Sequence, residues 1–339
     1  MDLHPTPEHD EIVESAAAYL ASELPAARAP KLTEPSLTGG EWAGLAAMGW
    51  FSMGLPEADG GLGLGVVESA LVAREFGRQL VPPQAVATML AVQLAWRLGD
   101  RELTEALAAG AQRAALAAPV REAGPAGPSA HGYRLVDTHR ADVAIGWSHG
   151  GAFLAPMDAF ASRVVAPSLD AALEVCVADG LDRAQARWSA EPASSFLPQA
   201  QVLTAAVLVG GAEACRDLSA EYAKTRHQFS RPIGSFQAIA HPCADMAVAC
   251  EAALSCLLYA AVCVRDGAPE RDLYSASARS VAYHAAYGNA AASMQVHGGY
   301  GQTYEYLPHF YLKRAMIYGL VGGGVEADEA AVLQAASLT

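Results

Sequence analysis

The stretch YAKTRHQFSRPIGSFQAIAHPCADM, residues 222–246, decides how the rest of the chain is interpreted. Apolar residues at helical spacing lead up to Tyr222, and the same spacing resumes from Phe236. Between these points Pro232 and Gly234 interrupt the pattern, because proline lacks a backbone N–H and glycine is a poor helix former. The sequence therefore predicts a loop that joins two long helices.

Four side chains of this loop have a chemistry that suits a nucleotide. Arg226 brings a fixed positive charge and Phe229 a flat ring, while Gln228 and Gln237 add amides. Such a set can contact a pyrophosphate and an adenine. The alternative interpretation is structural, since arginine at a helix end is commonly a surface charge and phenylalanine a core ring.

The wider pattern resembles a known family. R-x-Q-F-x-x-P-I-x-x-F-Q-x-I-x-H-x-x-A-D-M, as it stands from Arg226 to Met246, is similar to the signature of the acyl-CoA dehydrogenase family of flavoproteins. Q-V-H-G-G-Y-G at 295–301 resembles that family's Q-x-x-G-G-x-G segment, and K-R-A at 313–315 lies in the helix after it. L-P-E-A-D-G-G-L-G at 55–63 looks like its P-E-x-x-G-G-x-G turn. The resemblance is good in the C-terminal half and poor in the middle.

This resemblance implies an α+β fold in three parts. They are an all-α N-terminal domain at 1–112, a small central β domain at 113–195 and a C-terminal four-helix bundle at 196–339. The implied activity is FAD-dependent α,β-desaturation of an acyl-CoA thioester. In the family the bundle forms the oligomer interface, and the loop at Arg226 reaches the flavin of a neighbouring subunit.

The resemblance also implies which residues bind FAD. Arg226 would hold the pyrophosphate, with Gln228 and Phe229 at the adenosine end. The remaining side of the flavin site would come from the glycine-rich segment, where glycines let the cofactor approach the backbone closely. The full implied set is Arg226, Gln228, Phe229, Phe236, Gln237, Gln295, Gly298 and Gly299, with no metal ligand.

Hydrophobic periodicity agrees with this order of domains. Apolar spacing predicts five N-terminal helices, with Thr38 and Asp100 as caps or breaks: 9–24, 40–48, 65–76, 84–98 and 103–109. Short β-rich runs follow at 114–119, 133–136, 143–147, 152–155, 163–167 and 173–178. Helices are predicted again at 201–224, 236–266, 270–298, 304–318 and 327–335.

The central domain departs from the family pattern. The family supplies a Ser- or Thr-rich phosphate turn and a Trp-x-Thr segment against the isoalloxazine. In their places stand A-A-P-V-R-E-A-G-P-A-G at 117–127 and A-D-V-A-I-G-W at 141–147. We interpret the first as a flexible loop, and we do not expect a complete flavin pocket from this domain alone.

The catalytic base of the family is also missing. The reaction needs a desolvated carboxylate that removes a proton from C2 while a hydride leaves C3 for the flavin. Its usual position aligns with Gly322, and a position used by a minority of members aligns near Ala200. Losing a positioned base lowers rates by about two to four orders of magnitude. Glu326 and Glu305 are the candidates for a relocated base, although Glu326 also suits a helix start. His297 is interpreted as a packing or flavin-edge residue.

Composition excludes several classes of protein. The formal net charge is -14 with no Lys/Arg cluster, so binding to nucleic acid has no electrostatic support. No apolar run of the length that spans a bilayer is apparent, and residues 1–14 do not resemble a signal peptide, which predicts a cytoplasmic protein. The six cysteines include no C-x-x-C pair and are interpreted as small core residues of a reduced protein.

Three functions compete. The favoured one is the base-less partner of a two-chain enzyme, resembling the heterotetrameric (α2β2) acyl-CoA dehydrogenases of actinobacterial steroid side-chain degradation, with electron-transfer flavoprotein as acceptor. The second is a self-sufficient dehydrogenase whose base is Glu326 or Glu305. The third is a flavin-free binding or scaffold protein. The sequence names no acyl group, so a steroid acid, a branched chain and a biosynthetic intermediate remain open.

Overall fold

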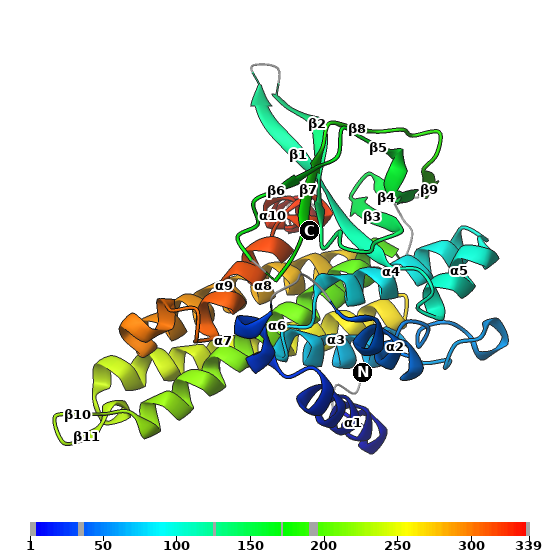
Figure 1. Ribbon diagram of the computed structural model, residues 1–339. Helices are drawn as coiled ribbons and strands as arrows, with labels where there is room; N and C mark the ends of the chain where they lie inside the picture. Colours follow the sequence, from blue (N-terminus) through cyan, green and yellow to red (C-terminus); the bar gives the residue numbers. More distant parts are fainter. Residues whose placement is uncertain (1–4, 33–36, 125–126, 171, 190–195, 337–339) are drawn as a thin grey trace.

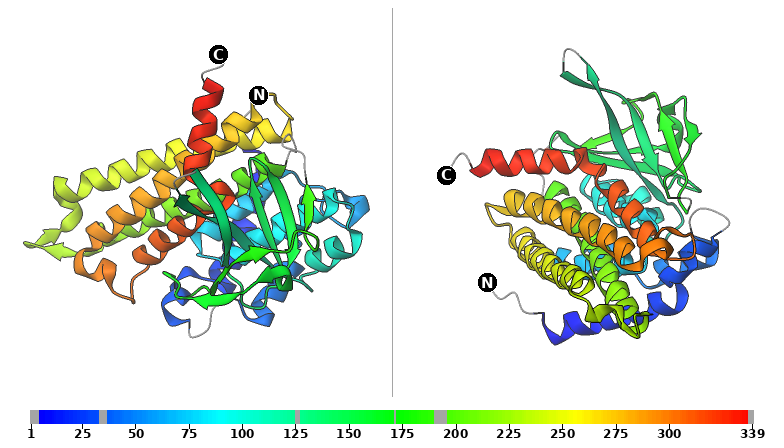
Figure 2. Two further views of the ribbon diagram at one scale, coloured as in Figure 1. Left: turned by 90° about the horizontal axis from the view of Figure 1, so that it is seen from above. Right: turned by 90° about the vertical axis from the view of Figure 1, so that its left-hand side faces the viewer.

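The structure, a computed structural model, describes residues 5–32, 37–124, 127–170, 172–189 and 196–336. Helices, a β sheet and further helices follow one another along the chain, which confirms the predicted three-part α+β fold (Figure 1). The two helical parts pack together into one body. The sheet covers one side of that body, and the last helix projects from it (Figure 2).

The N-terminal part confirms the five predicted helices, with ends displaced by a few residues. They are α1 (Pro7–Glu23), α2 (Gly39–Ala47), α3 (Val66–Arg78), α4 (Pro83–Arg97) and α5 (Arg101–Ala108), with short 3-10 turns η1 (Ala26–Lys31) and η2 (Glu57–Asp59). Thr38 forms a capping box at the start of α2, where its hydroxyl accepts from the Glu41 N–H at 3.2 Å. The Asp100 carboxylate likewise caps α5.

The central part is a seven-stranded sheet in the order β6-β7-β2-β1-β3-β4-β9. β1 pairs with β3 in parallel and with β2 antiparallel, and β5 pairs with β8 in a separate two-stranded ribbon. The strands are β1 (Ala114–Gly124), β2 (Gly127–Val136), β3 (Val143–Ser148), β4 (Gly151–Pro156), β5 (Phe160–Ala161), β6 (Val164–Ala166), β7 (Val175–Ala178), β8 (Gly180–Leu181) and β9 (Arg187–Ser189).

The segment 117–127 was predicted to be a flexible loop, but its described residues, 117–124 and 127, lie in the paired strands β1 and β2. Their ladder runs from Leu116 opposite Val136 to Gly124 opposite Gly127, with a bulge after Val120. β1 pairs with β3 only over its first three residues, so farther along the strand one edge carries no ladder bonds. A proline is tolerated at such an edge, and this is why Pro119 does not end the strand.

The C-terminal part contains α6 (Phe196–Thr225), α7 (Gln237–Arg265), α8 (Arg271–His297), α9 (Pro308–Tyr318) and α10 (Val325–Ala336). Short 3-10 turns η4 (Ile233–Ser235), η5 (Gly298–Gln302) and η6 (Val321–Gly323) join them. α9 begins four residues later than predicted because Pro308 takes its first position, where a missing N–H is harmless. Helix α6 is the central one and contacts α3, α7 and α8.

Glycines set the closest helix contact. A Cβ on Gly77 of α3 would lie 2.0 Å from the Val207 carbonyl oxygen, and one on Gly210 of α6 would lie 1.9 Å from that of Arg74. Only glycine therefore allows α3 and α6 to approach this closely. This contact joins the N-terminal and C-terminal helices into one core.

Helix α7 corrects the expectation that no apolar run is long enough to span a bilayer. Among the described helices it is the one that is long and apolar enough, by length and composition, to cross a membrane, with a mean hydropathy of 2.0. Only 39% of that apolar window is buried within the chain. Four of the six cysteines lie on α7, where Cys250 and Cys263 are buried and Cys243 and Cys256 are half-buried.

Candidate functional site

The two sequence blocks that carry the family resemblance meet at one end of the helical body. Helix α6 ends there at Thr225, α7 begins at Gln237, and α8 ends at His297. Tyr222 stacks on His297 with 4.3 Å between ring centroids. Next to this stack, the Arg226 guanidinium lies 5.7 Å from the centroid of the Tyr300 ring. The fold therefore brings together segments about seventy residues apart.

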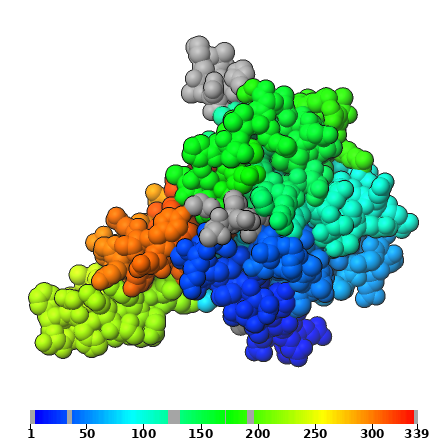
Figure 3. All heavy atoms as spheres, in the orientation of Figure 1, coloured from blue at the N-terminus to red at the C-terminus, as the bar shows by residue number. Residues whose placement is uncertain are grey.

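A short hairpin forms the tip of this end. Strands β10 (His227–Gln228) and β11 (Arg231–Pro232) pair, and the Ile233 N–H donates to the Arg226 carbonyl at 2.8 Å. The two residues between the strands, Phe229 and Ser230, have φ of 52° and 64°. The tip projects at the lower left of the molecule (Figure 3), where 87% of Phe229 is exposed.

The implied cofactor-binding residues lie on the surface of this end. Arg226, Gln228, Phe229, Gln237, Gln295, Gly298 and Gly299 are exposed, and Phe236 is half-buried. Gly298 has φ 62° and ψ -140°, which only glycine adopts readily. Among the described residues, no atom lies within 4 Å of a Cβ placed on Gly299, so this surface is open.

The electrostatics of the tip differ from those of the whole protein. Residues 222–244 contain Lys224, Arg226 and Arg231 and no aspartate or glutamate, whereas the chain as a whole carries a formal charge of -14. Helix α7 starts here with no side-chain cap, so its positive end adds to the basic charge. The tip is therefore suited to an anionic group.

His297 packs inside this end rather than facing solvent. It is 5% exposed, and its Nδ1 hydrogen-bonds the Ser293 carbonyl oxygen at 2.8 Å. Burial lowers the pKa of its imidazole, which keeps the ring neutral at pH 7. Its position against Tyr222 agrees with the packing role expected from the sequence.

The glycine-rich loop at the other end of α9 has no room for a side chain. Gly322 is buried and has φ 66°. A Cβ there would lie 2.5 Å from Nε1 of Trp147 on β3 and 3.3 Å from Nη1 of Arg279 on α8. The indole and the guanidinium thus fill the space that a larger residue at this position would need.

A buried polar network behind this loop was not foreseen from the sequence. Arg279 is fully buried, and its Nη1 pairs with Asp328 of α10 at 2.5 Å while its Nη2 donates to the Tyr318 and Val321 carbonyls. Gln201 of α6 donates to the same carboxylate at 2.7 Å. Burial lowers the pKa of the Arg279 guanidinium, and the Asp328 charge opposes that effect. The only sequence signal was one arginine in a run of Ala and Ser at 275–280.

The other candidate base positions lack a suitable environment. Glu326 and Glu305 are exposed, and Ala200 is fully buried in the core. Asp328 is the buried carboxylate near Gly322, but Arg279 and Gln201 hold its oxygens. In the described part of the chain, no free carboxylate therefore faces the space beside Gly322.

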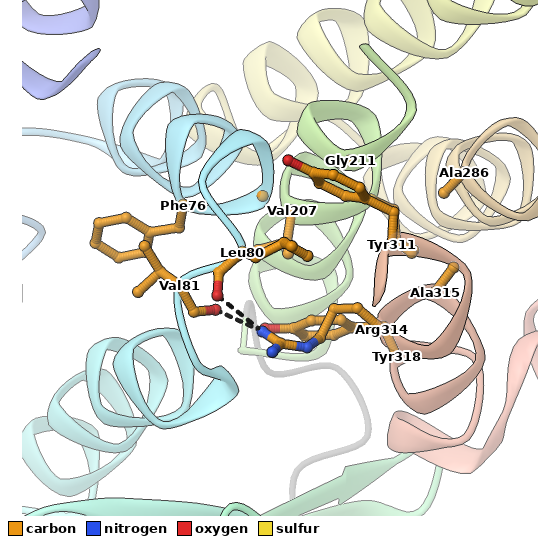
Figure 4. Close-up of a pocket in the computed structure, with 12 residues that line it drawn as sticks. Phe76, Leu80, Val81, Val207, Gly211, Ala286, Tyr311, Arg314, Ala315 and Tyr318 are labelled. Atoms are coloured by element: carbon orange, nitrogen blue, oxygen red, sulfur yellow. Dashed lines mark hydrogen bonds between the residues drawn. The ribbon is translucent and has the colours of Figure 1, made fainter. Parts of the chain in front are cut away.

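Three cavities of the described chain are lined by no residue of this loop. A buried cavity of about 10 Å3 lies between α3, α6, α8 and α9, with room for about one water (Figure 4). Arg314 borders it, donates to the Val81 carbonyl at 2.7 Å and pairs with the buried Asp170. Hollows of 340 and 410 Å3 lie beside α5. The small cavity could not hold an acyl chain.

Comparison with known proteins agrees with this architecture. Residues 6–112 match the family model "Acyl-CoA dehydrogenase, N-terminal domain" and residues 190–336 match "Acyl-CoA dehydrogenase, C-terminal domain". The acyl-CoA dehydrogenase IpdE2 of Mycobacterium tuberculosis is 34% identical over 267 residues, which cover 77% of this chain and 75% of IpdE2. The chain belongs to the acyl-CoA dehydrogenase family.

Two solved structures are similar over the whole chain. One is the ChsE4-ChsE5 complex of M. tuberculosis, at 24% identity and a TM-score of 0.81 with all of both chains covered. The other is the Tcur3481-Tcur3483 steroid acyl-CoA dehydrogenase, at 25% identity and a TM-score of 0.81, covering 98% of this chain and 99% of that one. This confirms the resemblance to steroid acyl-CoA dehydrogenases that the sequence motifs indicated.

Proposed function

We propose that this chain is the base-less subunit of a two-chain, FAD-dependent acyl-CoA dehydrogenase. A second chain of the same family supplies the carboxylate, and this chain completes its flavin site with the hairpin end. The complex desaturates an acyl-CoA in the cytoplasm and passes electrons to an electron-transfer flavoprotein. The similarity to the ChsE4-ChsE5 complex, which is named for two proteins, supports the two-chain assembly.

One observation carries this proposal. The position that aligns with the family's base is Gly322, and the atoms around it leave no space for a carboxylate. Trp147 from the sheet and Arg279 from α8 occupy that space, and Asp328 of α10 pairs with Arg279. A chain built in this way lacks both the base and the room for it at the usual position, which supports a base supplied by another chain.

The hairpin end fits FAD as one half of a site. Arg226 can bind a pyrophosphate with two parallel N–H groups, and Phe229 offers an exposed ring for adenine stacking. Gln228, Gln237 and Gln295 add amides on the same surface. When bound, FAD accepts the hydride from the acyl chain; the residues of this chain bind and orient it.

The outer face of the bundle supports a partner of similar fold. α7 leaves most of its apolar window uncovered, including Val248, which is 69% exposed. On the adjacent α8, Gly288 and Ala291 are exposed on the stripe that leads to Gln295. Small residues allow another helix to approach closely, and this face is continuous with the hairpin end.

The runner-up function, a self-sufficient dehydrogenase, depends on Glu326 or Glu305 as base, and we expect Glu326 to fail a direct test. Glu326 is exposed to water near the start of α10, whereas the carboxylate that removes the C2 proton must be desolvated. Glu326→Gln should therefore leave the turnover of the purified complex within about threefold. Acyl-CoA-dependent reduction of a flavin acceptor measures this. A loss of about a hundredfold or more with flavin still bound would match removal of a general base and refute the base-less assignment.

The flavin-free scaffold is the remaining alternative. It accounts for the altered central domain, but it gives no reason for a basic tip with exposed Arg226 and Phe229 on an acidic protein. Complete absence of FAD from the chain and from every complex that it forms would favour the scaffold.

A further inference from the structure

The hairpin is tied to the start of α7 through a single aromatic ring. The Arg231 guanidinium lies 4.1 Å from the centroid of the Phe236 ring. The Phe229 ring meets the same ring at 6.0 Å with an interplanar angle of 77°. Phe236 is the residue that precedes α7, so both sides of the turn are held against the rigid end of a helix.

The hairpin needs such support from outside its own ladder. It has only two residue pairs, and an isolated two-stranded ribbon is at best marginally stable in water. Its turn also places Phe229 and Ser230 in the left-handed region, where residues with a Cβ are disfavoured and Asn-Gly is preferred. Without further contacts the tip would sample other conformations.

Arg231 is placed to provide this support rather than to pair with an acid. Residues 222–244 contain no carboxylate, and the described residues offer Arg231 no ion pair. A guanidinium over an aromatic face is attracted by the ring quadrupole, and the stack covers that face of Phe236. The covered face is then unavailable for a flavin or an adenine.

We infer that Arg231 is a positioning residue, which stacks on Phe236 and thereby holds the hairpin in the conformation that presents Arg226 and Phe229. Phe236 acts as its platform and supports the hairpin. We call the stack of Arg231 on Phe236 the brace; it is a property of the single chain. Only its effect on FAD affinity rests on the proposed function.

Hydrogen exchange on the chain alone tests the brace. Arg231→Ala and Phe236→Leu should each speed exchange of the Ile233 amide, which closes the hairpin, by about threefold, as expected for one exposed cation–π contact. The double variant should exchange no faster than Phe236→Leu, because that substitution alone removes the ring on which Arg231 stacks. Phe236→Tyr keeps a ring and should behave as the unsubstituted chain, and Lys224→Ala is the matched loss of charge outside the hairpin. Unchanged exchange in both single variants, or additive effects, would overturn the brace.

FAD titration of the deflavinated complex tests the consequence. Arg231→Ala should weaken FAD binding about threefold, and the double variant should bind FAD no more weakly than Phe236→Leu alone. A direct phosphate contact would make Arg231→Ala much the larger effect and would overturn the positioning role. Arg226→Ala separates the two hypotheses: unchanged FAD affinity in that variant would refute the proposed function while the exchange result on the brace still stood.

Discussion

Glutamate at position 322 should damage the fold without restoring a dehydrogenase. Its Cβ would meet the Trp147 indole at 2.5 Å and the Arg279 guanidinium at 3.3 Å, and the backbone φ of 66° disfavours any side chain. Overpacking and the left-handed backbone together should lower the free energy of unfolding by about 2–5 kcal/mol. Denaturant unfolding of the purified Gly322→Glu chain measures this loss, and acyl-CoA-dependent flavin reduction measures activity.

Gly323→Glu is the matched control for this experiment. Gly323 lies in the same loop with φ 95°, but a Cβ there would meet only Ala327 at 3.5 Å and Ser148 at 4.0 Å. It shares the backbone penalty and lacks the clash, so it should be the less destabilised variant. Equal losses in the two variants would mean that Trp147 and Arg279 do not block the position, and new turnover in Gly322→Glu would show that the pocket can still use a base.

Removal of the Arg226 guanidinium should have the largest effect on flavin. Arg226 is exposed at the tip beside Tyr300, where it can form two charge-assisted hydrogen bonds to a pyrophosphate. Arg226→Ala should therefore raise the FAD dissociation constant of the complex by about ten- to a hundredfold. Visible absorbance of FAD per complex gives the occupancy, and size-exclusion chromatography reports whether the chains remain associated.

Lys224→Ala again provides the control, because it removes an exposed positive charge two residues earlier on α6. It should leave FAD occupancy nearly unchanged, whereas Arg226→Lys should recover only part of the affinity because lysine lacks the planar fork. If Arg226→Ala and Lys224→Ala weakened FAD binding equally, the tip would act through its general charge, and the specific role of Arg226 would be refuted.

The sequence predicted helices better than strands, for physical reasons visible at particular residues. Apolar spacing of α3 and α4 is local, so their positions were clear from the sequence. The β runs predicted at 114–119 and 133–136 lie in β1 and β2, but the outer part of their hairpin was missed. Pro119 can continue a strand only where its edge without an N–H is unpaired, and that depends on where the pairing of β1 with β3 ends. Which strands pair, and over which residues, depends on segments far apart in the sequence, so it cannot be predicted from local patterns.

The candidate site also has a part that the sequence predicts and a part that it does not. Local motifs located Arg226 and Gln295, and the stack of Tyr222 on His297 brings their segments together. The wall beside Gly322 could not be read from the sequence, because Trp147 comes from the sheet and Arg279 from α8. The Asp328 partner of Arg279 lies on yet another helix. Such a network is defined only when the three elements are packed.

The flavin content of the chain purified alone tests the central claim most directly. With half of the flavin site on its hairpin and no space for a base at Gly322, the lone chain should be nearly colourless, with less than about one tenth of an FAD per chain at micromolar concentration. Co-expressed with a glutamate-bearing partner of the same family, it should yield a yellow complex that oxidises acyl-CoA. A lone chain that retains one FAD per chain and reduces it with acyl-CoA would contradict this account.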